Sequence, residues 1–329
     1  LFMDSLAKIL PKMKKFNDYI NDVKKANFPI TLSGLSDSGK AHFVYATRFY
    51  TEKPVVVVTY NELQLKKIKE DMNFFSDEKV LTFPKKEVVY YDIDTMNKDT
   101  TMDRLNIYTK LYNNESCIIL TTVEALMQRT ISKNLLFSNA LQLEVGMSLL
   151  MEELTSRLVA LGYERTDMVE GRGNFCVRGG IVDVFPLTTL NPIRIEFWGD
   201  EIDSIRVFDV ESQRTIEAIK DISIFPAEEF LVDTSKLEDI GSKILEKYPN
   251  AISDVETIKN GNYLSKLDKY FEFFYDETSS LLDYVSKDTL VFVDEPARIV
   301  SKCQSIEFDN KEFIEAYLEK NKILPSYTN

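Results

Sequence analysis

The 329-residue sequence has little of the chemistry on which many enzymes depend. His42 is its only histidine, which disfavours imidazole catalysis and histidine-based metal sites, so we assign no catalytic residue and no metal ligand. The three cysteines, Cys117, Cys176 and Cys303, are odd in number and far apart. A disulfide framework is therefore not expected, and a reducing cytoplasm is the expected location.

Long apolar runs are also missing. No stretch of eighteen apolar residues is present, so no membrane span is expected. The first residues, "LFMDSLAKILPKMKK", have the pattern of an amphipathic helix and lack a signal-peptide cleavage site. The net charge of −13 disfavours non-specific binding to a nucleic-acid backbone. The length favours two or three domains.

Lysine is absent from one long stretch. None of the 29 lysines lies between Lys133 and Lys220, whereas seven of the 11 arginines do. Compositional drift is one explanation. The other is a separate module with an interaction surface, because arginine offers a planar, bidentate donor that lysine lacks.

The first part of the chain alternates strand and helix patterns. Strands are predicted at 28–34, 54–60, 79–84 and 116–122, and helices at 38–50, 61–75 and 100–113 with Asn61 as an N-cap. This alternation is typical of a parallel, doubly wound α/β layer. Between 162 and 209, short segments of period two are separated by turn residues, which predicts a small antiparallel sheet in an α+β insert.

The last part returns to helical patterns, with one more apolar strand at 289–293 that we expect to join the first sheet. The sequence therefore predicts a split RecA-like parallel-sheet domain with a small α+β domain inserted. The expected ranges are 1–132 for its first half, 133–227 for the insert and 228–329 for its second half with C-terminal helices.

The stretch "TLSGLSDSGKAHF" contains a G-x-x-x-x-G-K phosphate loop formed by Gly34, Gly39 and Lys40. Ala41 stands where the hydroxyl that holds Mg²⁺ is needed, and His42 lies on another helix face. The loop is therefore expected to be vestigial, without a cofactor, although weak binding of a nucleotide or phosphate ion stays open.

An acidic motif follows the last strand. Asp294 and Glu295 match a magnesium-linked Asp and a water-activating Glu. The alternative is structural, because Asp is a good N-cap and Pro296 suits the first turn of a helix. Both interpretations stay open at this point, and we regard the motif as vestigial.

The middle segment from "LGYERTDMVEGRGNFCVRGGIVDVFP" to "NPIRIEFWGDEIDSIRVFDVESQRT" closely resembles the interaction domain shared by UvrB and the bacterial transcription-repair coupling factors (Mfd). The flanks "TYNELQLKKIKEDMNFF", "TFPKKEVVYYDIDT" and "LLDYVSKDTLVFVDEPARI" resemble the split first domain of that family. Ala41 and the lack of a tyrosine-rich hairpin after "VVYYDIDT" resemble the coupling factors rather than UvrB.

The resemblance implies an N-terminal, UvrB-like module that recruits UvrA to RNA polymerase stalled at a lesion, in nucleotide excision repair. In the family, RNA polymerase, duplex DNA and ATP are bound by later domains of an ATP-dependent translocase. The resemblance implies that Arg178, Arg194 and Trp198 contact UvrA. Strand alternation places Arg194 and Trp198 on one face and Ile193 and Ile195 on the other, which predicts an exposed Trp198.

Other interpretations are kept beside this one. Arg206 is expected either to contact the partner or to pair with Asp200, Glu201 or Asp203, and Asp183 to form a local hydrogen bond. The chain as a UvrB-like ATP-binding half of a helicase or translocase is the alternative function. Direct DNA clamping is disfavoured by the charge, and a monomer is expected.

Overall fold

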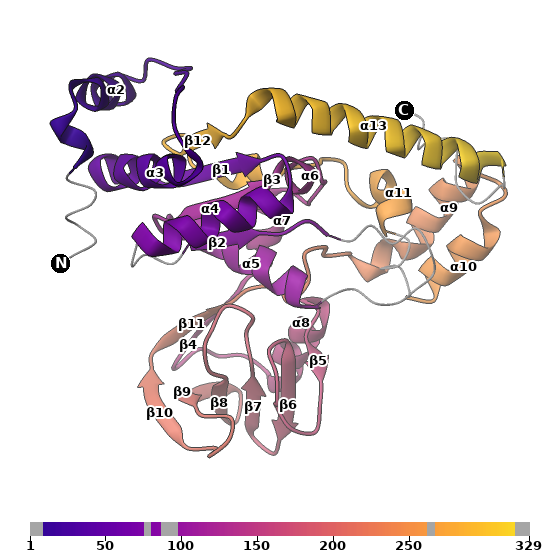
Figure 1. Cartoon of the computed structure of the whole chain (residues 1–329). Helices are drawn as coiled ribbons and strands as arrows, with labels where there is room; N and C mark the ends of the chain where they lie inside the picture. Colours follow the sequence, from indigo (N-terminus) through magenta and orange to yellow (C-terminus); the bar gives the residue numbers. More distant parts are fainter. Residues whose placement is uncertain (1–8, 76–79, 87–97, 262–266, 320–329) are drawn as a thin grey trace. The chain divides into compact units, whose positions relative to one another are not determined.

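The computed structural model describes residues 9–75, 80–86, 98–261 and 267–319 (Figure 1). The chain divides into two compact units. The first comprises 1–86, 110–128 and 280–329, and the second comprises 87–109 and 129–279. The domain limits expected from the sequence, 132/133 and 227/228, do not coincide with the limits of these units, because residues 228–279 lie in the second unit. The sequence-based domain limits stay a prediction.

The first unit contains a four-stranded parallel sheet in the order β12-β1-β3-β2. Its strands are β1 (Val55–Thr59), β2 (Val80–Phe83), β3 (Ile118–Thr122) and β12 (Leu290–Val293). The other elements are η1 (Leu10–Lys12), α2 (Lys14–Lys24), α3 (Asp37–Thr51), α4 (Glu62–Phe75), α6 (Val123–Leu126), α12 (Leu281–Tyr284) and α13 (Pro296–Glu319). Val55 pairs with Leu290 across 235 positions, so the expected return of the last apolar strand to this sheet is confirmed.

Apolar spacing explains the core of this unit. Phe16, Tyr19, Ile20 and Val23 lie on one face of α2 and are buried against α3, α4 and the sheet. The predicted cap of α4 is confirmed, because the Asn61 side chain accepts a hydrogen bond from the Gln64 N–H at 2.9 Å.

One predicted strand is wrong. Residues 28–34 form no strand, and β12 is consequently an edge strand whose Val291 and Val293 are about half exposed. Pro29 cannot donate to a ladder, and Phe28 stays exposed, so the segment gains little burial from pairing. The expected lack of a tyrosine-rich hairpin concerns residues 87–97, which lie outside the described residues.

The second unit contains a six-stranded sheet in the order β10-β9-β8-β7-β6-β5 and a two-stranded ribbon of β4 and β11. The strands are β4 (Leu141–Glu144), β5 (Glu164–Arg165), β6 (Asn174–Arg178), β7 (Ile181–Val184), β8 (Ile193–Trp198), β9 (Glu201–Phe208), β10 (Thr215–Ile219) and β11 (Asp221–Ile224). The helices are α5 (Lys98–Tyr112, which ends in the first unit), α7 (Lys133–Ser138), α8 (Met151–Ala160), η2 (Thr234–Lys236), α9 (Leu237–Lys247), α10 (Ile252–Lys259) and α11 (Leu267–Phe274).

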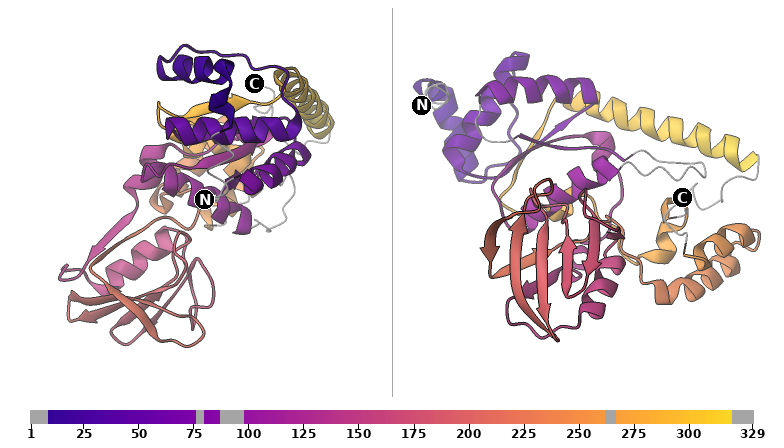
Figure 2. Two further views of the ribbon diagram at one scale, coloured as in Figure 1. Left: turned by 60° about the vertical axis from the view of Figure 1, so that its left-hand side comes forward. Right: turned by 90° about the horizontal axis from the view of Figure 1, so that it is seen from below.

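The right-hand view of Figure 2 shows the strands of the larger sheet side by side. Neighbouring strands are antiparallel as predicted, except that β5 runs parallel to β6. Val182, Ile195 and Ile205 are fully buried on one face, which is the core side.

A buried ion pair lies within the second unit. Arg104 of α5 donates from Nε and Nη2 to the two carboxylate oxygens of Glu229, both at 2.9 Å, and both side chains are 1% exposed. Thr130 and Tyr108 also donate to Glu229 Oε1. Because Arg104 and Glu229 are 125 positions apart, this pair joins distant parts of the chain. Within the described ranges, no helix is long and apolar enough to cross a bilayer.

Candidate functional sites

The phosphate-loop region lies at the start of α3. The Ser36 hydroxyl accepts the Gly39 N–H at 3.2 Å, and the Ser36 carbonyl accepts the Lys40 N–H at 2.9 Å. The helix N-terminus thus uses its own side chain to satisfy an amide that a phosphate would bind. Gly34 has a positive φ of 79°, a conformation that suits glycine.

The structure brings Lys40 together with the acidic motif. Its ammonium lies 2.8 Å from Asp294 Oδ1 and 2.7 Å from Glu295 Oε1. Asp294 is nearly buried and accepts a second hydrogen bond from Gln64 Nε2 at 3.1 Å. Partial burial lowers the pKa of Lys40, but the bonds to the two carboxylates outweigh it and raise that pKa above its ordinary value. The bond from Lys40 lowers the pKa of Glu295.

This arrangement differs from a phosphate-binding site in two respects. The cation that would reach the β- and γ-phosphates is neutralised by two carboxylates, and Ala41, at the magnesium position, is fully buried. Helix α13 begins at Pro296, so Glu295 and not Asp294 immediately precedes it. Asp294 is thus not at the N-cap position of the structural alternative, and its carboxylate pairs with Lys40.

The second candidate site is the solvent face of the six-stranded sheet. Strand pairing places Arg178 opposite Ile181, and Ile181 opposite Glu196. Trp198 follows Glu196 by two positions and therefore lies on the same face. Arg178 is exposed and Trp198 is 83% exposed, whereas Ile193 and Ile195 are buried on the reverse. The predicted exposure of Trp198 is confirmed. We call Arg178, Glu196, Trp198, Glu201 and Arg206 the outer face.

A bulge in β9 keeps this face polar. Glu196 pairs with Ser204, but the next residue, Phe197, pairs with Ile202, so β9 carries one extra residue. As a result Ile202 remains in the core at 0% exposure, and Glu201 lies directly opposite Trp198. The only tryptophan of the chain is thereby flanked by charged groups instead of core residues.

Arg194 lies on the same face of the sheet but is held by neighbours. Its Nε and Nη2 donate to the two oxygens of Asp183 at 2.7 and 2.8 Å, and Nη2 also donates to Gln213 Oε1 at 3.1 Å. The guanidinium lies 4.5 Å from the centre of the Phe208 ring. The bond to Asp183 raises the pKa of Arg194 despite partial burial.

The Arg194 side chain is 21% exposed and that of Asp183 4%, so sequence reasoning missed the main partner of this arginine. Strand alternation gives the face of a residue, but only the register between β7 and β8 reveals that these two residues are opposite each other.

The other two arginines differ from Arg194. Arg178 is exposed and donates from Nη2 to the Asp167 carbonyl at 3.2 Å. Arg206 pairs with Glu196 on β8 at 3.2 Å, and not with Asp200, Glu201 or Asp203 as the sequence suggested. The register explains this outcome, because Arg206 lies opposite Arg194 and one diagonal step from Glu196.

Comparison with known proteins agrees with this architecture. The sequence model of the UvrB interaction domain matches residues 141–230. A transcription-repair-coupling factor of Bacillus subtilis (strain 168) is 33% identical over 98% of this chain and 29% of its own length. The corresponding proteins of Staphylococcus haemolyticus and Haemophilus influenzae are 27% and 32% identical over 88% and 73% of this chain, and 26% and 21% of their own lengths.

The chain thus spans less than a third of the length of these relatives. The matched domain model covers all strands of the second unit, including the outer face. The chain therefore belongs with the transcription-repair-coupling factors as a UvrB-like segment of them, and residues 141–230 are its UvrB interaction domain.

Proposed function

We propose that this chain is an adaptor that recruits UvrA to lesion-stalled RNA polymerase, and that it does so through the outer face. The observation that carries the proposal is the 83% exposure of Trp198 within the matched domain. Tryptophan and arginine are the residues most enriched at the energetic centres of protein interfaces. Arg178 lies on the same face, and Arg206 and Glu196 supply charges around the tryptophan.

The three proposed contact residues act differently. Trp198 and Arg178 present exposed side chains to UvrA. Arg194 contributes through its remaining exposed edge, while its bonds to Asp183 fix its orientation. Rigid, preoriented side chains lose less conformational entropy on binding, which favours such an arrangement at an interface.

We also propose that the chain hydrolyses no ATP by itself and works in the cytoplasm as a monomer. The ion pairs of Lys40 and the buried Ala41 support a vestigial loop. In the complete protein, duplex DNA, RNA polymerase and ATP would be bound by other domains. The buried thiols of Cys117 and Cys176 suit a reducing compartment.

The test is a calorimetric titration of purified UvrA into the 329-residue chain and its variants. Trp198→Ala should weaken binding by about thirtyfold, the equivalent of about 2 kcal/mol. Leu190→Ala is the matched control, because Leu190 is 85% exposed in the same unit but lies outside the outer face. Arg178→Ala should also weaken binding. Its control is Arg157→Ala, which removes an exposed arginine of α8.

Arg194→Ala is a poorer first variant, because it leaves the nearly buried Asp183 without its partner. Loss of binding in both Trp198→Ala and Arg178→Ala, with both controls intact, would support the proposal. If both variants bind UvrA as tightly as the parent chain does, the UvrA site does not lie on the outer face. No binding by the parent chain would reject recruitment by this segment.

A further inference from the structure

The two-stranded ribbon of β4 and β11 carries a feature that the outer face does not explain. The ribbon is joined to the six-stranded sheet after β4 ends, where Gly146 donates its N–H to the Ile202 carbonyl of β9 at 2.8 Å. Between Gln142 and Glu144, however, the edge of β4 opposite β11 has no strand partner among the described residues. An unpaired edge presents backbone N–H and C=O groups on which another strand can pair. Natural proteins use such edges to bind extended peptides.

The register shows which backbone groups face outward from β4. The Val145 N–H donates to the Lys220 carbonyl, and the same alignment pairs Leu143 with Ile222 and Leu141 with Ile224. In an antiparallel pair every second residue bonds to the partner strand, so the amides of Leu141, Leu143 and Val145 point toward β11. The amides of Gln142 and Glu144 therefore point away from β11. The Glu144 carbonyl is taken by the Met147 N–H, which ends the edge in a turn.

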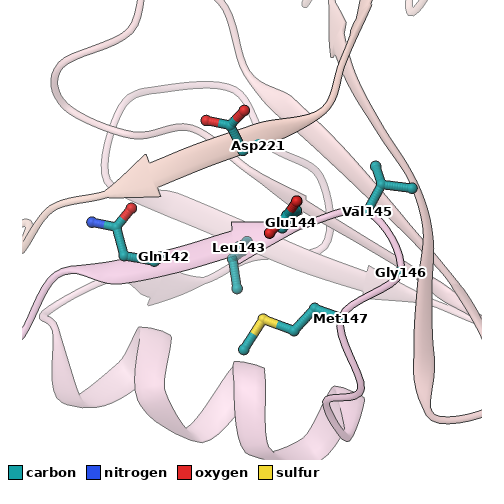
Figure 3. Close-up of a pocket in the computed structure, with 7 residues that line it drawn as sticks. All are labelled: Gln142, Leu143, Glu144, Val145, Gly146, Met147 and Asp221. Atoms are coloured by element: carbon teal, nitrogen blue, oxygen red, sulfur yellow. The ribbon is translucent and has the colours of Figure 1, made fainter.

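A groove of about 790 Å³ lies beside this edge, lined by residues 142–147 and Asp221 (Figure 3). Leu143 and Met147 point to the same side of β4, and Asp221 points to the other. Val145 is 40% exposed. The groove thus offers apolar contact next to open backbone donors, and the flexible methionine can adapt to an entering side chain.

The charge of the groove indicates which chemistry it accepts. Glu144 and Asp221 are exposed and lie directly opposite each other in the ribbon, where like charges repel. Among the residues that the structure describes, neither carboxylate forms an ion pair, even though Lys220 precedes Asp221 in the chain. Glu201 lies close to Gly146 and adds a third acidic group. A cationic side chain placed between the two opposed carboxylates would relieve their repulsion.

We propose that the open edge of β4 binds an extended, basic segment of a partner protein as an added strand. Backbone bonds would form to the Gln142 and Glu144 amides. Lysine or arginine side chains of the segment would lie over Glu144 and Asp221, and an apolar side chain would enter the groove beside Val145 and Met147. This site uses other residues than the outer face, with only Glu201 lying close to both, so it does not depend on the function proposed above.

The test uses a synthetic peptide with lysine at alternate positions and valine between them, capped at both ends. Its binding to the 329-residue chain is measured by calorimetry, and protection of single amides by hydrogen exchange. Glu144→Lys and Asp221→Lys should each weaken binding by about tenfold. Glu211→Lys is the matched control, because it reverses an exposed acid in a turn of the same unit.

Slower exchange at the Gln142 and Glu144 amides on addition of the lysine peptide, together with weaker binding by both groove variants, would support the proposal. A peptide with glutamate in place of lysine should not bind. Equal binding of that peptide, or unchanged exchange at the two amides, would overturn the proposal. The acids would then serve only to keep the edge from pairing with other chains.

Discussion

Asp183 and Arg194 lie directly opposite each other on neighbouring antiparallel strands and form two parallel hydrogen bonds of 2.7 and 2.8 Å. The carboxylate is almost completely buried, whereas the guanidinium retains an exposed edge. Truncating the arginine therefore leaves a charge in the protein interior without compensation. Removing one partner of a buried pair is among the more costly single substitutions.

We accordingly expect Arg194→Ala to lower the free energy of unfolding by about 3 kcal/mol. Arg206→Ala should cost about 1 kcal/mol or less, because Arg206 and Glu196 are both more exposed. Urea denaturation followed by circular dichroism measures both values. Equal values for the two variants would contradict the importance of burial at Asp183.

The ion pair between Arg104 and Glu229 gives a second prediction. Because both side chains are 1% exposed, Glu229→Gln should destabilise the chain by about 3–5 kcal/mol. In the double variant Arg104→Met/Glu229→Gln no buried charge is left unpaired, so it should be more stable than the single variant. If the double variant loses as much unfolding free energy as the two single variants Arg104→Met and Glu229→Gln lose together, the two residues are not energetically coupled.

The contact of Lys40 with Glu295 predicts a dependence of stability on pH. The bond from Lys40 lowers the folded-state pKa of Glu295 from its ordinary 4.5, so its contribution is present above pH 4.5 and is lost as pH falls through the folded value. Partial burial lowers the pKa of Lys40, but the bonds to Asp294 and Glu295 outweigh it and raise that pKa above its ordinary 10.5. Its contribution is present below pH 10.5 and is lost as pH rises through the folded value.

The difference in unfolding free energy between the parent chain and Lys40→Met should therefore be largest between about pH 5 and pH 10. It should shrink in stronger acid. Thermal unfolding at a series of pH values gives the comparison, and Lys66→Met, which replaces an exposed lysine of α4, is the control. A difference that stays constant into acid would contradict the role of the carboxylates.

Nucleotide binding offers a fourth test. We expect calorimetry to detect no binding of magnesium-ATP by the parent chain, because the Lys40 ammonium already contacts two carboxylates. Ala41→Thr should not restore affinity, since residue 41 is fully buried and the lysine remains paired. Measurable affinity that is abolished by Lys40→Ala would instead favour an ATP-binding half of a translocase.

Patterns of local origin were predictable from the sequence. The apolar strands at 55–59 and 118–122, the Asn61 cap and the exposure of Trp198 all follow from periodicity or from one short motif. Residues 28–34 show the limit of this reasoning, because their apolar composition resembles a strand although they pair with none. At these positions the contacts that the rest of the fold offers, and not the local strand propensity, determine whether a strand forms.

Long-range partners were not predictable in the same way. The bond between Arg194 and Asp183 depends on strand register, and the bond between Arg104 and Glu229 on the return of the chain after 125 positions. The approach of Lys40 to Asp294 was better signalled, because a phosphate loop and an acidic motif after a strand are parts of one site in related folds. Their direct pairing was visible only in three dimensions.

The bulge in β9 has a spectroscopic consequence. It places Glu201 instead of Ile202 opposite the exposed Trp198, so the tryptophan emission of the whole protein reports from one polar point on one surface. Emission from a hydrated indole shifts to shorter wavelength when a partner covers it. Occupation of the outer face can therefore be followed in the unlabelled protein, whereas an event at Lys40, which lies in the other compact unit, should leave that emission unchanged.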